Sequence, residues 1–168
     1  FEGTVLAKHN TGMGETIIGG IDANSTFHAK LIKDLFMSAY IPTEMADDVQ
    51  GVLWGKLLIN CAINPLTAIM RVPNGQLPKI TDLCEVMSRV IEEGAAVAQS
   101  AGITLPYSDP AAKVMEVCAA TAENRSSMLQ DIEAGKKTEI NYLNGALVRC
   151  GKETGVAAPL NSFLTHLV

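Results

Sequence analysis

The fold of this chain is decided by one stretch, Val52-Leu-Trp-Gly-Lys-Leu-Leu-Ile-Asn-Cys-Ala-Ile-Asn-Pro65. Apart from Asn60, every side chain from Leu57 to Ile63 is apolar, which predicts a helix that is buried over most of its surface. Lys56, Asn60 and Asn64 recur every four positions, so they lie within about 80° of one another on one helix face. Because a polar stripe on a buried helix needs polar surroundings, the stretch predicts a helix beside a cleft, a ligand or another domain.

From periodicity alone, two interpretations of this stripe stay open. In the first, the lysine reaches solvent and the two asparagines bond to neighbouring backbone. In the second, one ammonium and two amides in line bind a small anion that carries oxygens.

The composition limits the classes of protein to which the chain can belong. It has 168 residues, of which 48% are hydrophobic and 18% charged, so one domain, or a domain and part of another, can bury a core. Its formal charge is −5 and its longest basic run is Lys136-Lys137, which argues against a nucleic-acid partner. No apolar run approaches the ~20 residues of a membrane helix. We therefore expect no membrane partner and a soluble, cytoplasmic protein.

The cysteines and histidines indicate neither disulfides nor a metal site. Cys61, Cys84, Cys118 and Cys150 are widely spaced and form no C-x-x-C pair, which favours free thiols in a reducing cytosol. The three histidines share no metal-ligand spacing.

The pattern along the chain predicts a mainly helical protein with a short β segment at its start. Runs 3–8 and 15–20 are β-branched and joined by a Gly-bearing turn at 10–14, which predicts a strand pair. Asn24-Ser25 is expected to cap a helix that runs to about 39, and a short connection with Pro42 follows. Further helices are expected at 45–63, where Pro65 kinks or ends the helix, and at 81–101, 110–123, 127–134, 139–154 and after Pro159. Because the chain begins at Phe1 within strand-like sequence, we expect a piece of a longer polypeptide.

Several long strings carry a family resemblance. They are Asn60-Cys-Ala-Ile-Asn-Pro-Leu-Thr-Ala-Ile69, Pro73-Asn-Gly-Gln-Leu77, Thr121-Ala-Glu-Asn-Arg-Ser-Ser-Met-Leu-Gln-Asp-Ile132, Thr138-Glu-Ile-Asn-Tyr-Leu-Asn-Gly145 and Gly155-Val-Ala-Ala-Pro159. In this order, over essentially the whole chain, they resemble the ketopantoate reductases (2-dehydropantoate 2-reductases). The resemblance implies a helical substrate-binding domain at 41–168, of the 6-phosphogluconate dehydrogenase C-terminal type. It also implies that 1–40 is the end of a Rossmann-like nucleotide-binding domain, with a short strand remnant.

The resemblance also implies an activity, the NADPH-dependent reduction of 2-dehydropantoate to pantoate in pantothenate and coenzyme A biosynthesis. Lys56 matches the family's general acid. Hydride attack on a ketone leaves negative charge on oxygen, and a lysine can both neutralise that charge and donate a proton. Asn60 and Asn64 match the substrate-binding asparagines on the same helix.

Three further positions match family contacts but have simpler explanations. Asn74 matches a substrate residue, although Asn before Gly is commonly a turn residue. Ser127 matches the substrate serine, although either Ser126 or Ser127 can cap a helix. Glu139 matches the glutamate that contacts cofactor and active site, although behind a Thr138 cap its carboxylate would also be favoured by the helix dipole.

The family's Gly-x-Gly-x-x-Gly fingerprint does not occur in this sequence. Gly12-Met-Gly14 precedes a strand rather than a helix, so it is not a phosphate loop. We therefore expect the main NADPH contacts to lie on a missing N-terminal Rossmann domain, and the chain alone to be inactive. Two alternatives stay open: a related reductase of another 2-oxo acid, and a non-catalytic helical module whose apolar helices bury a homodimer seam.

Overall fold

The computed structural model describes residues 16–168, which divide into two compact units that meet at Val49. The expected strand at 3–8 and the turn at 10–14 lie outside the described residues.

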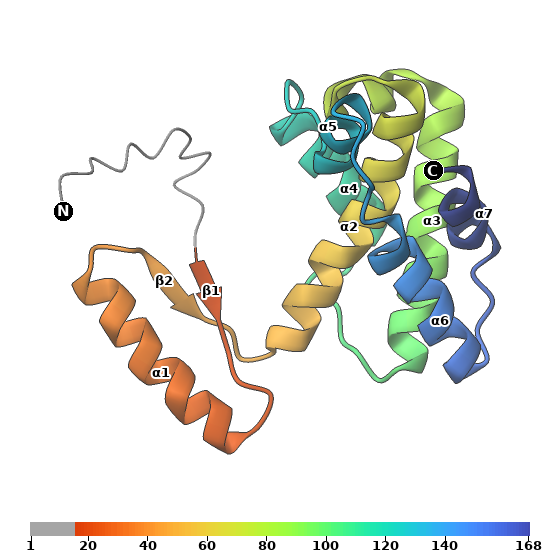
Figure 1. The fold of residues 1–168 in the computed structure, drawn as a ribbon. Helices are drawn as coiled ribbons and strands as arrows, with labels where there is room; N and C mark the ends of the chain where they lie inside the picture. The colour runs from red at the N-terminus through yellow and green to blue at the C-terminus, as the bar shows by residue number, and fades with distance from the viewer. Residues whose placement is uncertain (1–15) are drawn as a thin grey trace, which may run out of the picture. The chain divides into compact units, whose positions relative to one another are not determined.

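The first unit contains a strand, a helix and a second strand: β1 (Thr16–Ile18), α1 (Ala23–Ser38) and β2 (Thr43–Met45) (Figure 1). β1 and β2 pair in parallel, with Thr16 opposite Thr43 and Ile18 opposite Met45. Parallel pairing requires a crossover, and α1 supplies it. The sequence prediction missed β2, because a three-residue strand with a central Glu44 carries no alternating apolar pattern.

The N-cap of α1 is Asp22, not Asn24-Ser25 as expected. The Asp22 carboxylate accepts the Ser25 backbone N–H at 2.7 Å, and the Ser25 hydroxyl accepts the Asp22 N–H at 3.0 Å. This reciprocal pair is a capping box, which satisfies donors that the first turn leaves unpaired. The hydrogen bonds from the backbone and side chain of Ser25 lower the pKa of Asp22.

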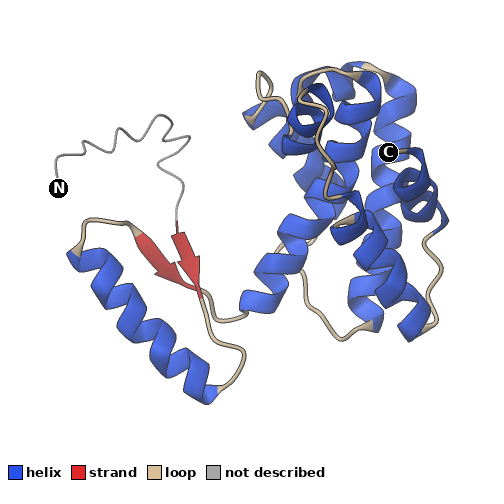
Figure 2. Ribbon diagram, in the orientation of Figure 1, coloured by secondary structure: helices blue, strands red, loops and turns tan. Residues whose placement is uncertain are grey.

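The second unit is entirely helical (Figure 2). Its elements are α2 (Val49–Met70), η1 (Asn74–Lys79), α3 (Thr81–Ser100), α4 (Pro110–Ala120), α5 (Ser127–Glu133), η2 (Ile140–Tyr142), α6 (Asn144–Thr154) and α7 (Pro159–Leu167). The mainly helical fold is thus confirmed, and the helices expected at 81–101, 110–123, 127–134 and after Pro159 are present. Gly102, Gly135 and Gly155 have positive φ and lie just after α3, α5 and α6, a conformation that glycine adopts readily at helix C-termini.

Two helices differ from the prediction. α2 continues through Pro65 to Met70 rather than ending near 63. The helix expected at 139–154 is divided, because Leu143 leaves the helical region (φ −98°, ψ −99°) between η2 and α6. Both differences depend on contacts between helices that no local pattern encodes.

α2 is the central helix of the core. Its Leu58, Cys61 and Ala62 are at most 1% exposed and belong to one apolar cluster with side chains from α3, α4, α6 and α7. Trp54 packs against the same cluster. Contrary to the sequence prediction, α2 is long and apolar enough to pass as a membrane span, with 22 residues and a mean hydropathy of 1.4. However, 56% of that window is buried inside the protein, which is typical of a core helix.

Candidate functional site

One face of α2 lines a cavity of about 610 Å³. Lys56 and Asn60 both lie on its wall, as the stripe predicts. Its other lining residues come from α2, from the loop before α4 and from α4: Val52, Gly55, Ile59, Pro106, Tyr107, Lys113, Glu116 and Val117. An apolar wall with a few polar groups is typical of small-molecule sites.

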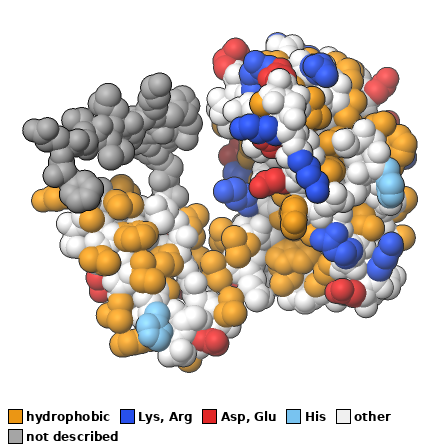
Figure 3. Space-filling model, in the orientation of Figure 1, with side chains coloured by type: hydrophobic (Ala, Val, Ile, Leu, Met, Phe, Trp, Pro, Cys, Tyr) orange, Lys and Arg blue, Asp and Glu red, His pale blue; other side chains and the backbone are white. Residues whose placement is uncertain are grey.

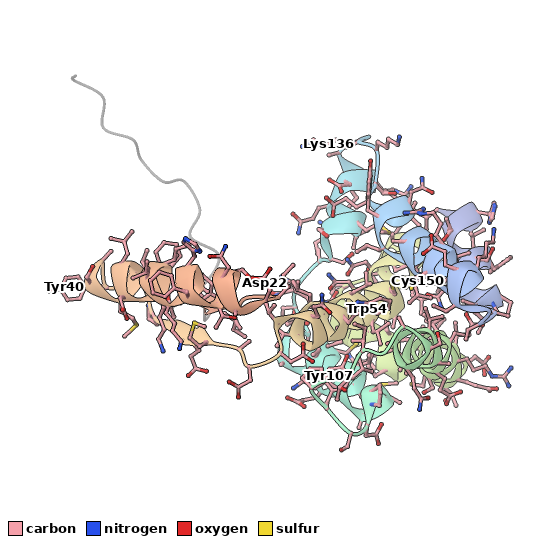
Figure 4. The ribbon with its side chains drawn as sticks, turned by 90° about the horizontal axis from the view of Figure 1, so that it is seen from below. Asp22, Tyr40, Trp54, Tyr107, Lys136 and Cys150 are labelled. Atoms are coloured by element: carbon pink, nitrogen blue, oxygen red, sulfur yellow. The ribbon has the colours of Figure 1, made fainter. Side chains whose placement is uncertain are left out.

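The close approach of a loop to α2 forms one side of this cavity. The Tyr107 hydroxyl donates to the Gly55 carbonyl at 2.8 Å, and Figure 4 labels Tyr107 on the chain that leads to α4. A Cβ on Gly55 would lie 3.0 Å from Pro106 and 3.1 Å from the Tyr107 ring, so glycine permits this packing. Burial raises the pKa of Tyr107, which keeps its hydroxyl protonated and able to donate. The sequence prediction passed over Tyr107, whose only signal was its place between Pro106 and Pro110 in a short loop.

The two lysines on the cavity differ in their charge partners. Lys113 forms an ion pair with Glu116, with 2.8 Å between Nζ and Oε1. Lys56 is exposed and makes no ion pair with any residue that the structure describes. Because the charges of Lys113 and Glu116 offset each other, Lys56 gives this wall its net positive charge.

Asn64 lies further along α2 and is only 7% exposed. The Thr67 hydroxyl lies 2.9 Å from the Asn64 carbonyl oxygen and 2.7 Å from the Ser126 hydroxyl oxygen. Ser126 Oγ also accepts the Leu129 N–H at 3.1 Å, so Ser126 is the N-cap of α5. The structure therefore shows that Ser126 caps the helix and that Ser127, the next residue, is exposed.

Glu139 lies toward the same end of α2. The next residue, Ile140, packs with Ala68 and Met128 in a small apolar cluster. Glu139 itself is exposed at the N-cap of η2, the short first part of the divided helix. The Thr138 hydroxyl is a weak cap, since its oxygen lies 3.5 Å from the Ile140 nitrogen.

Asn74 is held by the fold and does not line the cavity. Its Nδ2 donates to Thr121 Oγ1 at 2.9 Å, and its backbone N–H donates to the Asn124 carbonyl at 2.9 Å. Its Oδ1 is buried and has no hydrogen-bond partner among residues 16–168. A Cβ on Gly75 would meet Ala122 at 2.5 Å, so the glycine allows this turn to approach the 121–124 loop.

The expected site residues therefore form two groups along one helix. Lys56 and Asn60 share the cavity, whereas Asn64, Ser127 and Glu139 lie toward the C-terminal end of α2. Eight residues separate Lys56 from Asn64, which corresponds to about 12 Å along the axis. A carboxylate-bearing substrate and a cofactor ring can together extend over such a distance.

A family model described as "Ketopantoate reductase PanE/ApbA C terminal" matches residues 48–168. The chain belongs to the ketopantoate reductase family. Among its relatives, the 2-dehydropantoate 2-reductase of Archaeoglobus fulgidus is 40% identical over 94% of this chain and 52% of its own length. That of Vibrio cholerae is 38% identical over 96% of this chain and 54% of its own length. The chain thus spans about half the length of these reductases.

Solved structures give the same assignment. A ketopantoate reductase from Ralstonia eutropha superposes with a TM-score of 0.83 at 37% identity, over 94% of this chain and 51% of that one. A D-mandelate dehydrogenase in complex with NADH superposes with a TM-score of 0.86 at 28% identity, over 94% and 54%. The fold of this ketopantoate reductase family member is therefore shared with a dehydrogenase of another name.

Proposed function

We propose that this chain is the helical half of an enzyme that reduces 2-dehydropantoate to pantoate with NADPH, a step in pantothenate and coenzyme A biosynthesis. The observation that carries the proposal is the cavity wall on which Lys56, with no ion pair to any of residues 16–168, lies next to Asn60. The names of the most similar relatives support the same reaction.

Each polar side chain has a role in this proposal. Lys56 donates the proton to the keto oxygen while its charge offsets the negative charge that develops there. The amides of Asn60 and Asn64 and the hydroxyl of Ser127 hold the carboxylate and hydroxyl of the substrate through neutral donors. The Asn74 amide uses one N–H to bond Thr121, so its second N–H would be the group that contacts substrate, while its Oδ1 is buried.

Among the residues of this chain, the proposal gives only Glu139, at one edge of the site, a contact with the nicotinamide cofactor. The exposed Glu139 carboxylate makes no hydrogen bond or ion pair with any described residue, so it is available to contact the cofactor. When bound, NADPH supplies the hydride. The remaining contacts belong, in this proposal, to a Rossmann-like domain whose last part is the β1-α1-β2 unit.

The surface of α1 supports that domain assignment. Of the helix's sixteen residues only Ala29 is buried, while Phe27, Leu31 and Leu35 are 60%, 53% and 63% exposed. Figure 3 shows hydrophobic side chains gathered over this unit. Apolar surface of this kind needs a partner, and two short strands do not form a stable sheet alone. Since β2 pairs with β1, we extend the proposed nucleotide-binding part from 40 to the end of β2.

The test is turnover by the full-length protein, followed as oxidation of NADPH in the presence of 2-dehydropantoate. We expect saturable turnover, with NADPH preferred over NADH. A full-length protein that folds and binds NADPH but does not turn over any 2-oxo acid would contradict the proposal.

A second candidate substrate is another 2-oxo acid, and the high TM-score of the D-mandelate dehydrogenase favours keeping it. Comparing kcat/KM for 2-dehydropantoate with that for an aromatic 2-oxo acid, with each cofactor, separates the two candidates. The non-catalytic module has less support, because the polar stripe lines a cavity rather than an apolar seam. A homodimer and a cytoplasmic location stay predictions.

A further inference from the structure

Pro65 interrupts the hydrogen bonding of α2 within the polar stripe. In an α-helix each carbonyl accepts the N–H four residues later, so Cys61 requires a donor at position 65. Proline has no N–H and usually kinks or breaks a helix. Yet α2 continues to Met70, and Cys61 is 1% exposed, so water does not satisfy its carbonyl.

Asn144, at the start of α6, supplies the missing hydrogen bond. Its Nδ2 lies 3.0 Å from the Cys61 carbonyl oxygen, and the side chain is fully buried. The same Nδ2 donates to Asn161 Oδ1 at 2.9 Å. Both N–H bonds of the Asn144 amide are thus directed at acceptors, while its Oδ1 is buried and has no partner among the described residues.

The orientation of Asn144 is fixed from α3 through α7. Asn161 Nδ2 donates to the Val90 carbonyl at 3.1 Å and to Glu93 Oε2 at 2.9 Å, so its Oδ1 must face Asn144. The Glu93 carboxylate also accepts the backbone N–H groups of Leu160 and Asn161, the first turn of α7. The charged Glu93 carboxylate polarises the Asn161 amide, which in turn polarises the Asn144 amide. Each hydrogen bond in this chain is thereby strengthened.

We propose that Asn144 is a positioning residue for the reductase site, held by Asn161 and Glu93, that replaces the hydrogen bond removed from α2 by Pro65. The Cys61 carbonyl lies on the turn between Asn60 and Asn64, so this bond sets the direction of the Asn64 amide relative to Lys56 and Asn60. The inference rests on the proposed function for its effect on catalysis. Its structural part, the dependence of the 61–65 turn on Asn144, does not.

The test compares Asn144→Leu in the wild-type full-length protein and in a Pro65→Ala background. Leucine has a similar volume but no donor, and alanine at 65 restores the N–H that Cys61 requires. We expect Asn144→Leu to lower kcat/KM for the 2-oxo acid by roughly 10- to 100-fold, as small misplacements of site groups do. The KM for NADPH should change little. In the Pro65→Ala background, the fold decrease in kcat/KM caused by Asn144→Leu should be several times smaller.

Hydrogen exchange of the amides of residues 66–68 measures the turn itself in the same proteins. Asn144→Leu should accelerate their exchange, and Pro65→Ala should restore it. Asn141→Leu is the matched control, since Asn141 is exposed three residues away, and it should leave both exchange and kinetics unchanged. Glu93→Gln, which keeps the side-chain length, is a milder second variant with the same expected direction.

Two outcomes would overturn the inference. One is a decrease in kcat/KM on Asn144→Leu that is equally large in the wild-type protein and in the Pro65→Ala background. The other is a lower thermal midpoint with unchanged KM, kcat and exchange at 66–68, which would make Asn144 a general core residue. If the wild-type protein turns over no 2-oxo acid, the proposed function fails, while the exchange measurements still decide whether Asn144 replaces the bond.

Discussion

Lys56 and Lys113 lie on the same cavity but differ in what their ammonium groups contact. Lys113 is paired with Glu116, whereas Lys56 makes no ion pair with a described residue. Lys56→Ala in the full-length protein should lower kcat by roughly 10²-fold or more, because it removes the proposed general acid. Lys113→Ala is the matched control and should change kcat little, since exposed pairs contribute little. Equal losses from both variants would show that the cavity only requires positive charge.

The Cys118 thiol makes the free energy of unfolding depend on pH in the alkaline range. Burial, and secondly the neighbouring Cys84, raise the pKa of the Cys118 thiol to about 11 from an ordinary value of 9.0. Above pH 9 the unfolded chain loses this proton while the folded chain keeps it until about pH 11, so this contribution to stability falls as pH rises. The slope is at most about 1.4 kcal/mol per pH unit. The free energy of unfolding of Cys118→Ala should fall less steeply with pH than that of the wild type. Part of the slope remains, because burial also raises the pKa of Cys61. An identical pH dependence would contradict the assignment.

At the scale of elements, glycines show where conformation rather than packing matters. Gly155 ends α6 with φ +78° and a Cβ there would touch nothing within 4 Å, so only backbone strain opposes a side chain. Gly155→Ala should destabilise the protein by about 1–2 kcal/mol. Gly145, inside the same helix, would give a Cβ only ordinary contacts at 3.5 Å. Gly145→Ala should be neutral or slightly stabilising; chemical denaturation of both variants checks the difference in sign.

At the scale of the whole molecule, the proposed function gives this chain one side of a two-sided site. Its sequence contains no Gly-x-Gly-x-x-Gly fingerprint, and the relatives that it matches are about twice its length. The 168-residue chain alone should therefore bind NADPH weakly or not at all and show no reductase activity. Fluorescence titration with NADPH and a turnover assay, with the full-length protein as the positive control, check this prediction. Measurable turnover by the short chain would refute it.

The sequence by itself determined the helical fold and the polar stripe, because both follow from local periodicity. Apolar spacing and the Gly and Pro residues located most helices, and the four-residue repeat placed Lys56 and Asn60 on one face, where the structure finds a cavity. Long family strings determined the assignment, and the family match confirmed it.

Only the tertiary structure decided how that stripe is supported. Local sequence patterns predicted that α2 ends near Pro65. Instead, the Asn144 side chain of α6, eighty-three residues along the chain from Cys61, supplies the donor that Pro65 lacks. Local rules could not choose between Ser126 and Ser127, whereas the bond from the Leu129 N–H shows that Ser126 is the cap, and Thr67, distant in sequence, donates to the same hydroxyl. The short strand β2 had no sequence signal, and the place of Tyr107 between two prolines did not indicate its bond to Gly55. Each of these features depends on a partner distant in sequence, and periodicity contains no information about such partners.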